Sequence, residues 1–306
     1  MLCSRMNNNF SILITTKNRL KELKRTLVTL SPLLKRGDVE CFICDDGSSD
    51  GTQAFLESQQ SDIQLWLESK SKGYLYHRNY MLRTTTAKYS VSLDDDAHFL
   101  TENVLETISQ YFETNPTCGL LTFRIFWGQE APKKTATSDV SYAVNGFVGC
   151  GHVWRMQAWK EIPDYPEWFQ FYGEEQFAAL QLFKKGWYIR YAPEVLVQHR
   201  VDMLARKTQK DYLQRQRRSL RAGWYVYFMC YPFAIAFRLF LSSIWSQLRR
   251  KTFKGNMQAT RALMLAFYDI LIHVPKFLTN RYRLSNSQYR EFTNLPKVPI
   301  YWKPHE

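Results

Sequence analysis

The 306-residue sequence has no cysteine pair of the CxxC type and no cysteine and histidine spacing typical of a zinc site. Its six cysteines, most of which lie in apolar segments typical of buried strands, are Cys3, Cys41, Cys44, Cys118, Cys150 and Cys230. We therefore expect reduced thiols in the core, which favours a cytosolic protein. The opening stretch MLCSRMNNNF also has none of the apolar character of a signal peptide, and this favours the same compartment.

Uninterrupted apolar runs of roughly 20 residues, the length of a membrane-spanning helix, are missing as well. The most apolar segments are 225–245, which is broken by Pro232 and Arg238, and 259–278. A central arginine costs about 2.5 kcal/mol or more on membrane insertion scales. The second segment carries three polar residues, Asp269, His273 and Lys276. We expect both segments to form amphipathic helices that lie in a membrane interface without spanning the bilayer.

Acidic residues are scarce in the last third of the chain. Residues 1–199 contain 21 Lys and Arg against 23 Asp and Glu, whereas residues 200–306 contain 20 against 5. This asymmetry predicts a polyanionic partner for the last third, either nucleic acid or an anionic membrane face. A membrane is favoured because aromatic residues accompany the arginines; the two groups are Trp224, Tyr225, Tyr227 and Phe228, and Arg215, Arg217, Arg218 and Arg221. A helical lid or a dimer interface is the alternative.

Strand and helix patterns alternate through the first two thirds. Strands are expected at 10–16, 39–44, 63–69, 89–93, 119–128 and 188–200, and helices at 18–34, 53–60, 77–85 and 102–112. Such alternation predicts an α/β fold with a mostly parallel sheet and helices on both faces. Ligands of open sheets bind beyond the carboxyl ends of the strands, where the clusters Asp45-Asp46 and Asp94-Asp95-Asp96 fall.

The three consecutive carboxylates in VSLDDDAHFL repel one another, which predicts a bound cation. Strand side chains alternate, so Asp94 and Asp96 are expected to point to the same side. Asp96 would ligate a divalent cation through oxygen while Asp94 reaches a hydroxyl or a second ligand. The alternative is a solvated loop that caps the helix at 102–112, although Thr101 could provide that cap.

Three further residues are candidates for chemistry. Asp46, before Gly47-Ser48, could accept the imide N–H of a pyrimidine or could simply form an Asx turn. Glu175 lies in the first turn of an expected helix, where the dipole favours an ionised carboxylate, and it is a candidate general base. His199 closes the last strand and is either structural or a metal ligand.

These segments, taken together, resemble family 2 of the nucleotide-sugar-dependent glycosyltransferases. The resemblance covers residues 10–199 and is carried, in the family's order and spacing, by FSILITTKNR, CDDGSSDGT, the HRN of GYLYHRN, LDDDA, GEEQF and PEVLVQH. It implies the GT-A fold, an inverting reaction, and Mn²⁺ or Mg²⁺ as cofactor.

The resemblance also assigns donor-site roles residue by residue. Thr15 and Asp46 match positions that hold the nucleotide base. Arg78 matches an arginine near the nucleotide. Asp94 and Asp96 match the family's DxD motif, with Asp96 as the metal-side carboxylate.

Further roles concern the acceptor side and the metal shell. Glu175 matches the catalytic base, and His199 matches a histidine that completes the metal shell in some relatives. Glu175 is one methylene longer than the usual aspartate, and Phe177 stands where another acidic residue is often found. Residues expected to contact the acceptor or the sugar are Trp168, Phe171, Tyr172 and Glu174.

We therefore expect an inverting glycosyltransferase that uses UDP or dTDP sugars and a glycan or lipid-linked acceptor at the cytoplasmic membrane face, in polysaccharide or glycolipid assembly. Residues 1–199 would form the catalytic domain and residues 200–306 a basic, membrane-associating helical region. Two alternatives stay open. A nucleotidyltransferase would need a Gly- and Lys-rich loop, and TTKNRLKEL lacks glycine. A catalytically silent relative would bind membrane or RNA through the basic region.

Overall fold

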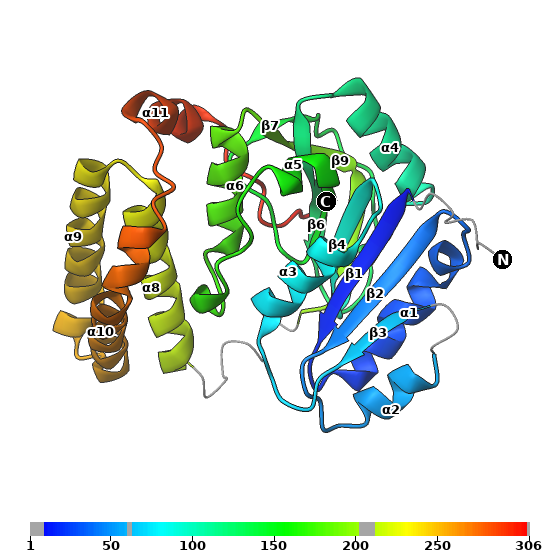
Figure 1. Ribbon diagram of the computed structural model, residues 1–306, viewed down its shortest axis with the longest axis horizontal. Coiled ribbons are helices and arrows are strands. Elements are labelled where there is room, and N and C mark those ends of the chain that lie inside the picture. Colours follow the sequence, from blue (N-terminus) through cyan, green and yellow to red (C-terminus); the bar gives the residue numbers. More distant parts are fainter. Residues whose placement is uncertain (1–8, 60–62, 202–211, 305–306) are drawn as a thin grey trace.

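A computed structural model describes residues 9–59, 63–201 and 212–304. Its centre is one mixed sheet of nine strands in the order β3-β2-β1-β4-β8-β6-β9-β5, with β7 beside β9 (Figure 1). The strands are β1 (Phe10–Thr16), β2 (Val39–Asp45), β3 (Gln64–Leu67), β4 (Tyr89–Asp94), β5 (Ala97–Phe99), β6 (Cys118–Trp127), β7 (Tyr142–Val144), β8 (Gly151–Arg155) and β9 (Tyr188–His199). Neighbours from β3 to β4 pair in parallel, so their carboxyl ends meet at one edge.

Helices cover both faces of the sheet because successive strand residues point to opposite sides. In β1, Ile12 and Ile14 join the core beneath α1 (Leu20–Leu34) and α4 (Val104–Thr114), whereas Leu13 joins the core on the other face. The remaining helices of this part are α2 (Thr52–Glu57), α3 (Tyr74–Thr84), α5 (Met156–Lys160) and α6 (Glu174–Lys184). The expected α/β architecture is therefore confirmed.

The helix at 102–112 begins differently from the expectation. It starts at Val104 after Asn103, without a side-chain cap, and β5 separates it from the acidic triplet. Thr101 donates its hydroxyl to the Glu194 carbonyl and accepts a hydrogen bond from the Leu196 amide, at 3.0 and 2.8 Å. The expectation that Thr101 caps this helix is wrong because its hydroxyl fastens the helix entry to β9 instead.

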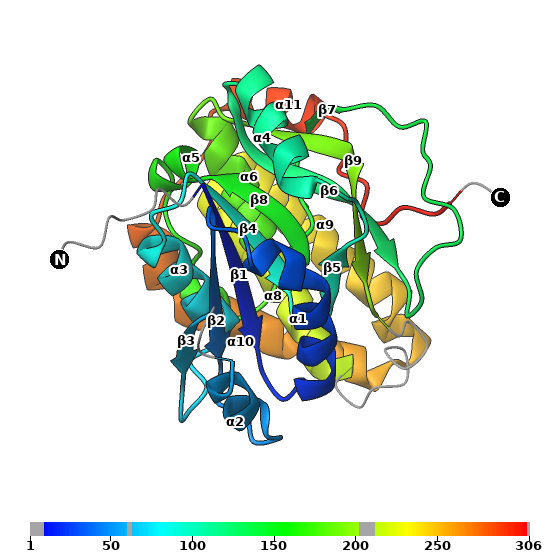
Figure 2. The same ribbon diagram turned by 90° about the vertical axis from the view of Figure 1, so that its right-hand side faces the viewer.

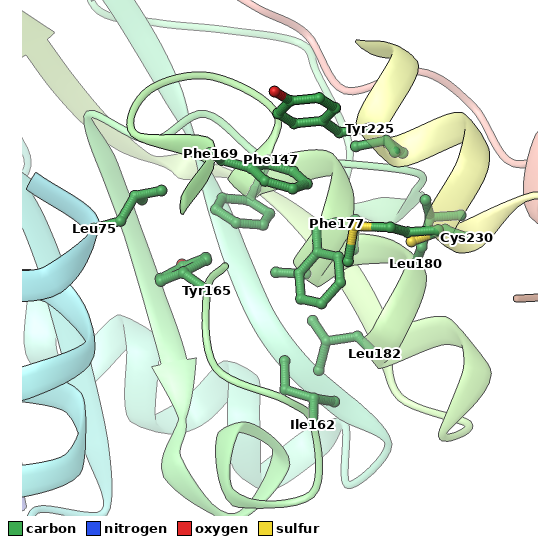
Figure 3. Close-up of a cluster of buried hydrophobic side chains, with 14 of the residues drawn as sticks. Leu75, Phe147, Ile162, Tyr165, Phe169, Phe177, Leu180, Leu182, Tyr225 and Cys230 are labelled. Atoms are coloured by element: carbon green, nitrogen blue, oxygen red, sulfur yellow. The ribbon is translucent and has the colours of Figure 1, made fainter. Parts of the chain in front are cut away.

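A layer of helices at the end of the chain packs against α6 (Figures 1 and 2). It consists of α8 (Tyr212–Cys230), α9 (Phe233–Arg250), α10 (Met257–Thr279) and α11 (Asn286–Asn294). Figure 3 shows Tyr225 and Cys230 of α8 beside Phe177 and Leu180 of α6 in one cluster of buried side chains. The core thus continues across residue 200, and the division of the chain at 199 stays a prediction.

The expectation that the aromatic residues beside the arginines of α8 face a membrane is wrong for two of them. Trp224 and Tyr225 are 1% and 0% exposed, because they pack on Phe240 of α9 and Phe277 of α10. Residues 207–211 of the expected basic helix lie outside the described residues, as does Cys3. The other five cysteines are buried and unpaired with one another.

Candidate active site

A cleft of about 810 Å³ opens at the carboxyl ends of the strands. Its walls include Thr15 from β1, Asp46 after β2, Asp94 from β4, Asp96, and His199 from β9. These residues come from segments up to 184 positions apart in the sequence. Because β1 pairs in parallel with β2 and β4, the residues at the ends of these three strands, Thr15, Asp46 and Asp94, meet at one edge of the sheet. The cleft is where an open α/β sheet binds its ligand.

The three carboxylates of the triplet separate into two roles. Asp95 points toward β1, where it accepts a hydrogen bond of 2.8 Å from the Thr16 hydroxyl and pairs with Arg19 at 2.8 Å. Burial raises the pKa of Asp95 to about 7, although Arg19 lowers it. Asp94 and Asp96 instead project together into the cleft. Asp95 is therefore a structural residue, and the other two carboxylates face the cleft.

Asp94, Asp96 and His199 form a cluster that fits a divalent cation. One ligand atom from each lies within 4.8 Å of the others, and Nε2 of His199 is 3.0 Å from Oδ1 of Asp96. Burial lowers the pKa of His199, but Cys150 and Asp96 raise it to about 11, so a metal ion would have to displace the proton from its Nε2 atom. Two carboxylates and an imidazole are donors that Mn²⁺ and Mg²⁺ accept. This juxtaposition agrees with the expectation from the sequence.

Two arginines that the sequence analysis missed line the same cleft. Arg19, at the start of α1, pairs with both Asp95 and Asp96. Arg200 is buried, donates to Glu22 on α1 at 2.8 Å, and its backbone N–H donates to the Asp96 carbonyl at 2.9 Å. Their neighbours in the sequence gave the only signal: Arg19 belongs to TTKNR and Arg200 follows His199 directly.

Asp46 lines the cleft, but its carboxylate already serves the protein. It accepts hydrogen bonds from the Ser71 hydroxyl, from the amides of Lys72 and Gly73, and from His77, at 2.5 to 3.0 Å. Burial opposes ionisation, but these bonds, that from Ser71 foremost, lower the pKa of Asp46 to about 2. The Asx turn belongs to its neighbour, because Asp45 accepts the amides of Gly47 and Ser48. Base recognition by Asp46 stays a prediction.

Thr15 and Arg78 occupy different positions relative to the cleft. The Thr15 hydroxyl is buried at the cleft wall without a hydrogen-bond partner among the described residues, which leaves it available to a ligand. Arg78 is 4% exposed and lies behind the wall, where it donates to Asp94 at 2.8 Å and to the Gly149 carbonyl at 3.1 Å. Arg78 thus orients Asp94, and direct contact with a nucleotide stays untested.

Glu175 lies next to Gly149, the residue whose carbonyl binds Arg78. Its carboxylate accepts a hydrogen bond of 2.5 Å from the amide of Gly149, whose carbonyl binds Arg78. Glu175 is partly exposed and lies outside the set of residues that line the cleft. Burial of the carboxyl group and the neighbouring Glu174 raise the pKa of Glu175 to about 8. A carboxylate with a pKa near neutrality is suited to accept a proton from a hydroxyl group.

The aromatic residues before Glu175 separate into two groups. Phe171 lines the cleft with Tyr74, their rings 5.7 Å apart. Tyr172 has φ of +70°, rare for a side chain that is not glycine, and this turns the segment toward α6. Trp168 instead stacks on His273 of α10 with 5.2 Å between ring centroids. The ring of Trp168 joins the sheet domain to α10 and lies outside this cleft, so its expected contact with an acceptor or a sugar stays a prediction.

Glu174 does not reach the cleft either. It is 7% exposed, burial raises its pKa, and its Oε2 has no hydrogen-bond partner among the described residues. The expected contact of Glu174 with a sugar is not supported by this position. Its nearness to Glu175 instead raises the pKa of that residue.

The fold is that of the GT-A glycosyltransferases. The structure superimposes on the mannosyltransferase PcManGT from Pyrobaculum calidifontis in complex with GDP-Man and Mn²⁺, with a TM-score of 0.54, 17% identity, and coverage of 94% of this chain and 84% of that one. S. aureus TarS 1-349 in complex with UDP-GlcNAc gives a TM-score of 0.53 and 14% identity, with 92% of each chain covered. At these identities the likeness concerns the fold.

Residues 11–172 match the model of the family described as Glycosyl transferase family 2, and the chain belongs to that family. The uncharacterised glycosyltransferase YfnE of Bacillus subtilis (strain 168) is 29% identical over 120 residues, which are 38% of this chain and 31% of that relative. The match thus spans about a third of the relative's length. This family assignment agrees with the resemblance that the sequence predicted.

Proposed function

We propose that this protein transfers a sugar from a nucleoside-diphosphate sugar to an acceptor hydroxyl with inversion of the anomeric configuration. The observation that carries the proposal is the joint placement of Asp94, Asp96 and His199 within 4.8 Å, with Arg78 and Gly149 linking Asp94 to Glu175. Solved relatives with this fold carry Mn²⁺ with GDP-Man or with UDP and GalNAc, which supports a metal-assisted reaction.

The donor end of the cleft would hold the diphosphate. Asp96 and His199 would ligate Mn²⁺ or Mg²⁺, and Asp94 would be kept in position by Arg78. When bound, the ion supplies a Lewis acid that neutralises charge on the departing diphosphate. Lys17 and Arg19 line the cleft and add positive charge where the phosphates would lie. The free hydroxyl of Thr15 would accept or donate a hydrogen bond to the nucleoside.

The acceptor end would be organised by Glu175. Its carboxylate accepts the proton of the acceptor hydroxyl while that oxygen forms a bond to the anomeric carbon. The bond to the diphosphate oxygen breaks on the opposite face, and its electron pair leaves with the diphosphate. Phe171, at the cleft wall and 38% exposed, offers an apolar face for a sugar ring. One displacement of this kind inverts the configuration.

The substrate classes are part of the proposal. An ionised Asp46 at the cleft wall complements the imide N–H of uracil or thymine, which favours UDP or dTDP sugars. A glycan or a lipid-linked sugar is the proposed acceptor, consistent with the basic helices beside the sheet. We propose a location at the cytoplasmic face of the cell membrane.

The test is a thermal unfolding experiment with UDP, dTDP, GDP and CDP, each with and without Mn²⁺. A ligand that binds only the folded state raises the melting temperature. We expect a rise that needs both UDP or dTDP and the metal. A companion variant, Glu175→Gln, should keep this rise and lose most transfer. An absence of any nucleotide-dependent rise would favour a catalytically silent relative, and full transfer by Glu175→Gln would refute its role as base.

A further inference from the structure

Large apolar side chains gather on the outer surface of α9 and α10. Nineteen large hydrophobic residues are exposed in the described part of the chain, and thirteen of them lie between Phe233 and Leu278. Only four lie in the sheet domain before residue 200. Isolated exposed apolar residues are ordinary, but a concentration on two adjacent helices marks an interaction surface. We call the twelve of these residues that lie on α9 and α10 the outer apolar face.

The outer apolar face is a regular stripe on α9. Phe233, Phe237, Leu241 and Trp245 recur every four residues and are 48 to 60% exposed. Residues four apart lie on the same side of a helix. Another side of α9 is already occupied, because Ala236 and Phe240 are buried against the rest of the helical layer. The stripe therefore does not serve the core of this chain.

α10 is apolar on both sides. It is long and apolar enough to cross a membrane by length and composition, yet only 33% of its apolar window is buried. One side of α10 packs on α8 through small and apolar residues. The side that continues the outer apolar face is exposed and includes Met264, Phe267, Tyr268, Leu271 and Leu278. A helix that is hydrophobic all round normally has apolar surroundings on every side.

α10 is nevertheless held against α8 by a buried ion pair near its middle. Asp269, near its middle, is 1% exposed and accepts two hydrogen bonds from the Arg217 guanidinium of α8, at 2.7 and 2.5 Å. A helix held in this way along its length lies against the helical layer. It can press its outer side into a bilayer surface without crossing the bilayer.

The charges around the outer apolar face have one sign. Asp269 is the sole acidic residue between Phe233 and Thr279, and it is buried and paired with Arg217. The basic residues of the same segment are Arg238, Arg249, Arg250, Lys251, Lys254, Arg261 and Lys276. Exposed apolar and aromatic side chains on a segment whose other charges are all basic complement an anionic lipid surface.

We propose that the outer apolar face of α9 and α10 docks onto the surface of an anionic bilayer. The apolar side chains enter the boundary between headgroups and acyl chains, and the arginines and lysines contact the phosphates. This assigns membrane contact to residues other than the aromatic group around Trp224, which is buried.

The test is co-sedimentation with vesicles of phosphatidylcholine alone or with about 30% phosphatidylglycerol, in the absence of any nucleotide. The variant is Phe237→Glu with Trp245→Glu and Leu271→Glu. All three side chains are about half exposed, so the fold should survive. The matched control is Val28→Glu with Val140→Glu, two residues of the sheet domain that are 75% and 70% exposed. Melting temperature and sedimentation velocity accompany each sample.

We expect the wild type and the control to bind anionic vesicles about tenfold more tightly than neutral ones, with weaker binding at high salt. The triple variant should lose about tenfold or more at an unchanged melting temperature. Binding of the triple variant at wild-type strength would overturn the proposal. So would a wild-type protein that ignores the vesicles, or a dimer that the triple variant dissociates, because the occupant would then be a second copy. These outcomes are independent of nucleotide binding and therefore of the proposed reaction.

Discussion

The guanidinium of Arg19 pairs with the carboxylate of Asp96, the residue that would ligate a metal. Arg19 is still 43% exposed at its side chain, so its guanidinium has room to move into the cleft. A cation held by Asp96 therefore has to compete with a positive charge that belongs to the protein.

Removal of this competitor should strengthen metal binding. We expect Arg19→Gln to lower the Mn²⁺ concentration needed for half-maximal thermal stabilisation by about fivefold, since a half-exposed ion pair contributes about 1 kcal/mol. The matched control is Arg25→Gln on the same helix, whose partner is Glu22. Weaker metal binding by Arg19→Gln would mean that Arg19 helps to hold the donor phosphates or the metal site.

A side chain at residue 149 should displace the proposed base. A Cβ built on Gly149 would lie 2.5 Å from Oε1 of Glu175, so Gly149→Ala must push the carboxylate away. We expect a loss of about 100-fold or more in turnover with little change in donor binding, because misplacement by about 1 Å is this costly. Gly146→Ala is the control, since its Cβ would meet only Val298 at 3.5 Å. Equal turnover of both variants would remove Glu175 from the reaction.

The raised pKa of Glu175 predicts the pH dependence of the reaction. The base must be ionised, so turnover should rise with pH and level off above about 8. The measurement is a pH profile of kcat/KM at saturating metal. A profile that is flat between pH 6 and 9 would contradict the assignment.

The same raised pKa predicts a change in stability. The ordinary pKa of a glutamate is 4.5, and that of Glu175 in the folded protein is about 8. Between pH 4.5 and about pH 8 the folded state therefore keeps a proton on Glu175 that the unfolded state has lost. Stability therefore falls as pH rises through this window. Glu175→Gln removes the ionisable group, and we expect it to melt several degrees higher than the wild type at pH 8 and equally near pH 4.5. Glu113→Gln, at an exposed carboxylate, should show no such difference.

The buried pair of Arg217 and Asp269 should stabilise the helical layer. Asp269→Asn leaves two arginines, Arg217 and Arg221, without a buried counter-charge, and it should cost about 3 kcal/mol in the free energy of unfolding. Denaturant unfolding measures this cost. A smaller loss when Arg217→Met is added would confirm that the two residues act as a pair.

Much of the fold could be predicted from local patterns. Apolar strands and amphipathic helices alternate regularly from Phe10 onward, which predicts the sheet. The acidic triplet ends a strand, so the position of Asp94 and Asp96 at the edge of the sheet could be predicted as well. The position of His199 beside this pair could also be predicted, because His199 closes the last strand at the same edge.

The remaining features depend on contacts between distant segments. Arg19 meets Asp96 across 77 residues, and nothing in its immediate surroundings indicates that partner. Trp224 was placed on the wrong side because the second half of α8, from Ala222 to Cys230, is apolar on nearly every side, and a helical pattern cannot tell which side is covered. The contact of Trp168 with His273 of α10 could not be predicted either, since a ring that packs on a distant helix looks identical in sequence to one that binds a sugar.

The shared core between α6 and α8 changes what attachment to a membrane would mean. A flexible linker would let the catalytic part search at many heights above the lipid. Here Tyr225 and Cys230 pack directly on Phe169 and Phe177, so the cleft and the outer apolar face belong to one solid body (Figure 3). The height of the cleft above the bilayer would then be a fixed length, and acceptors would be selected by how far their hydroxyl group stands from the surface.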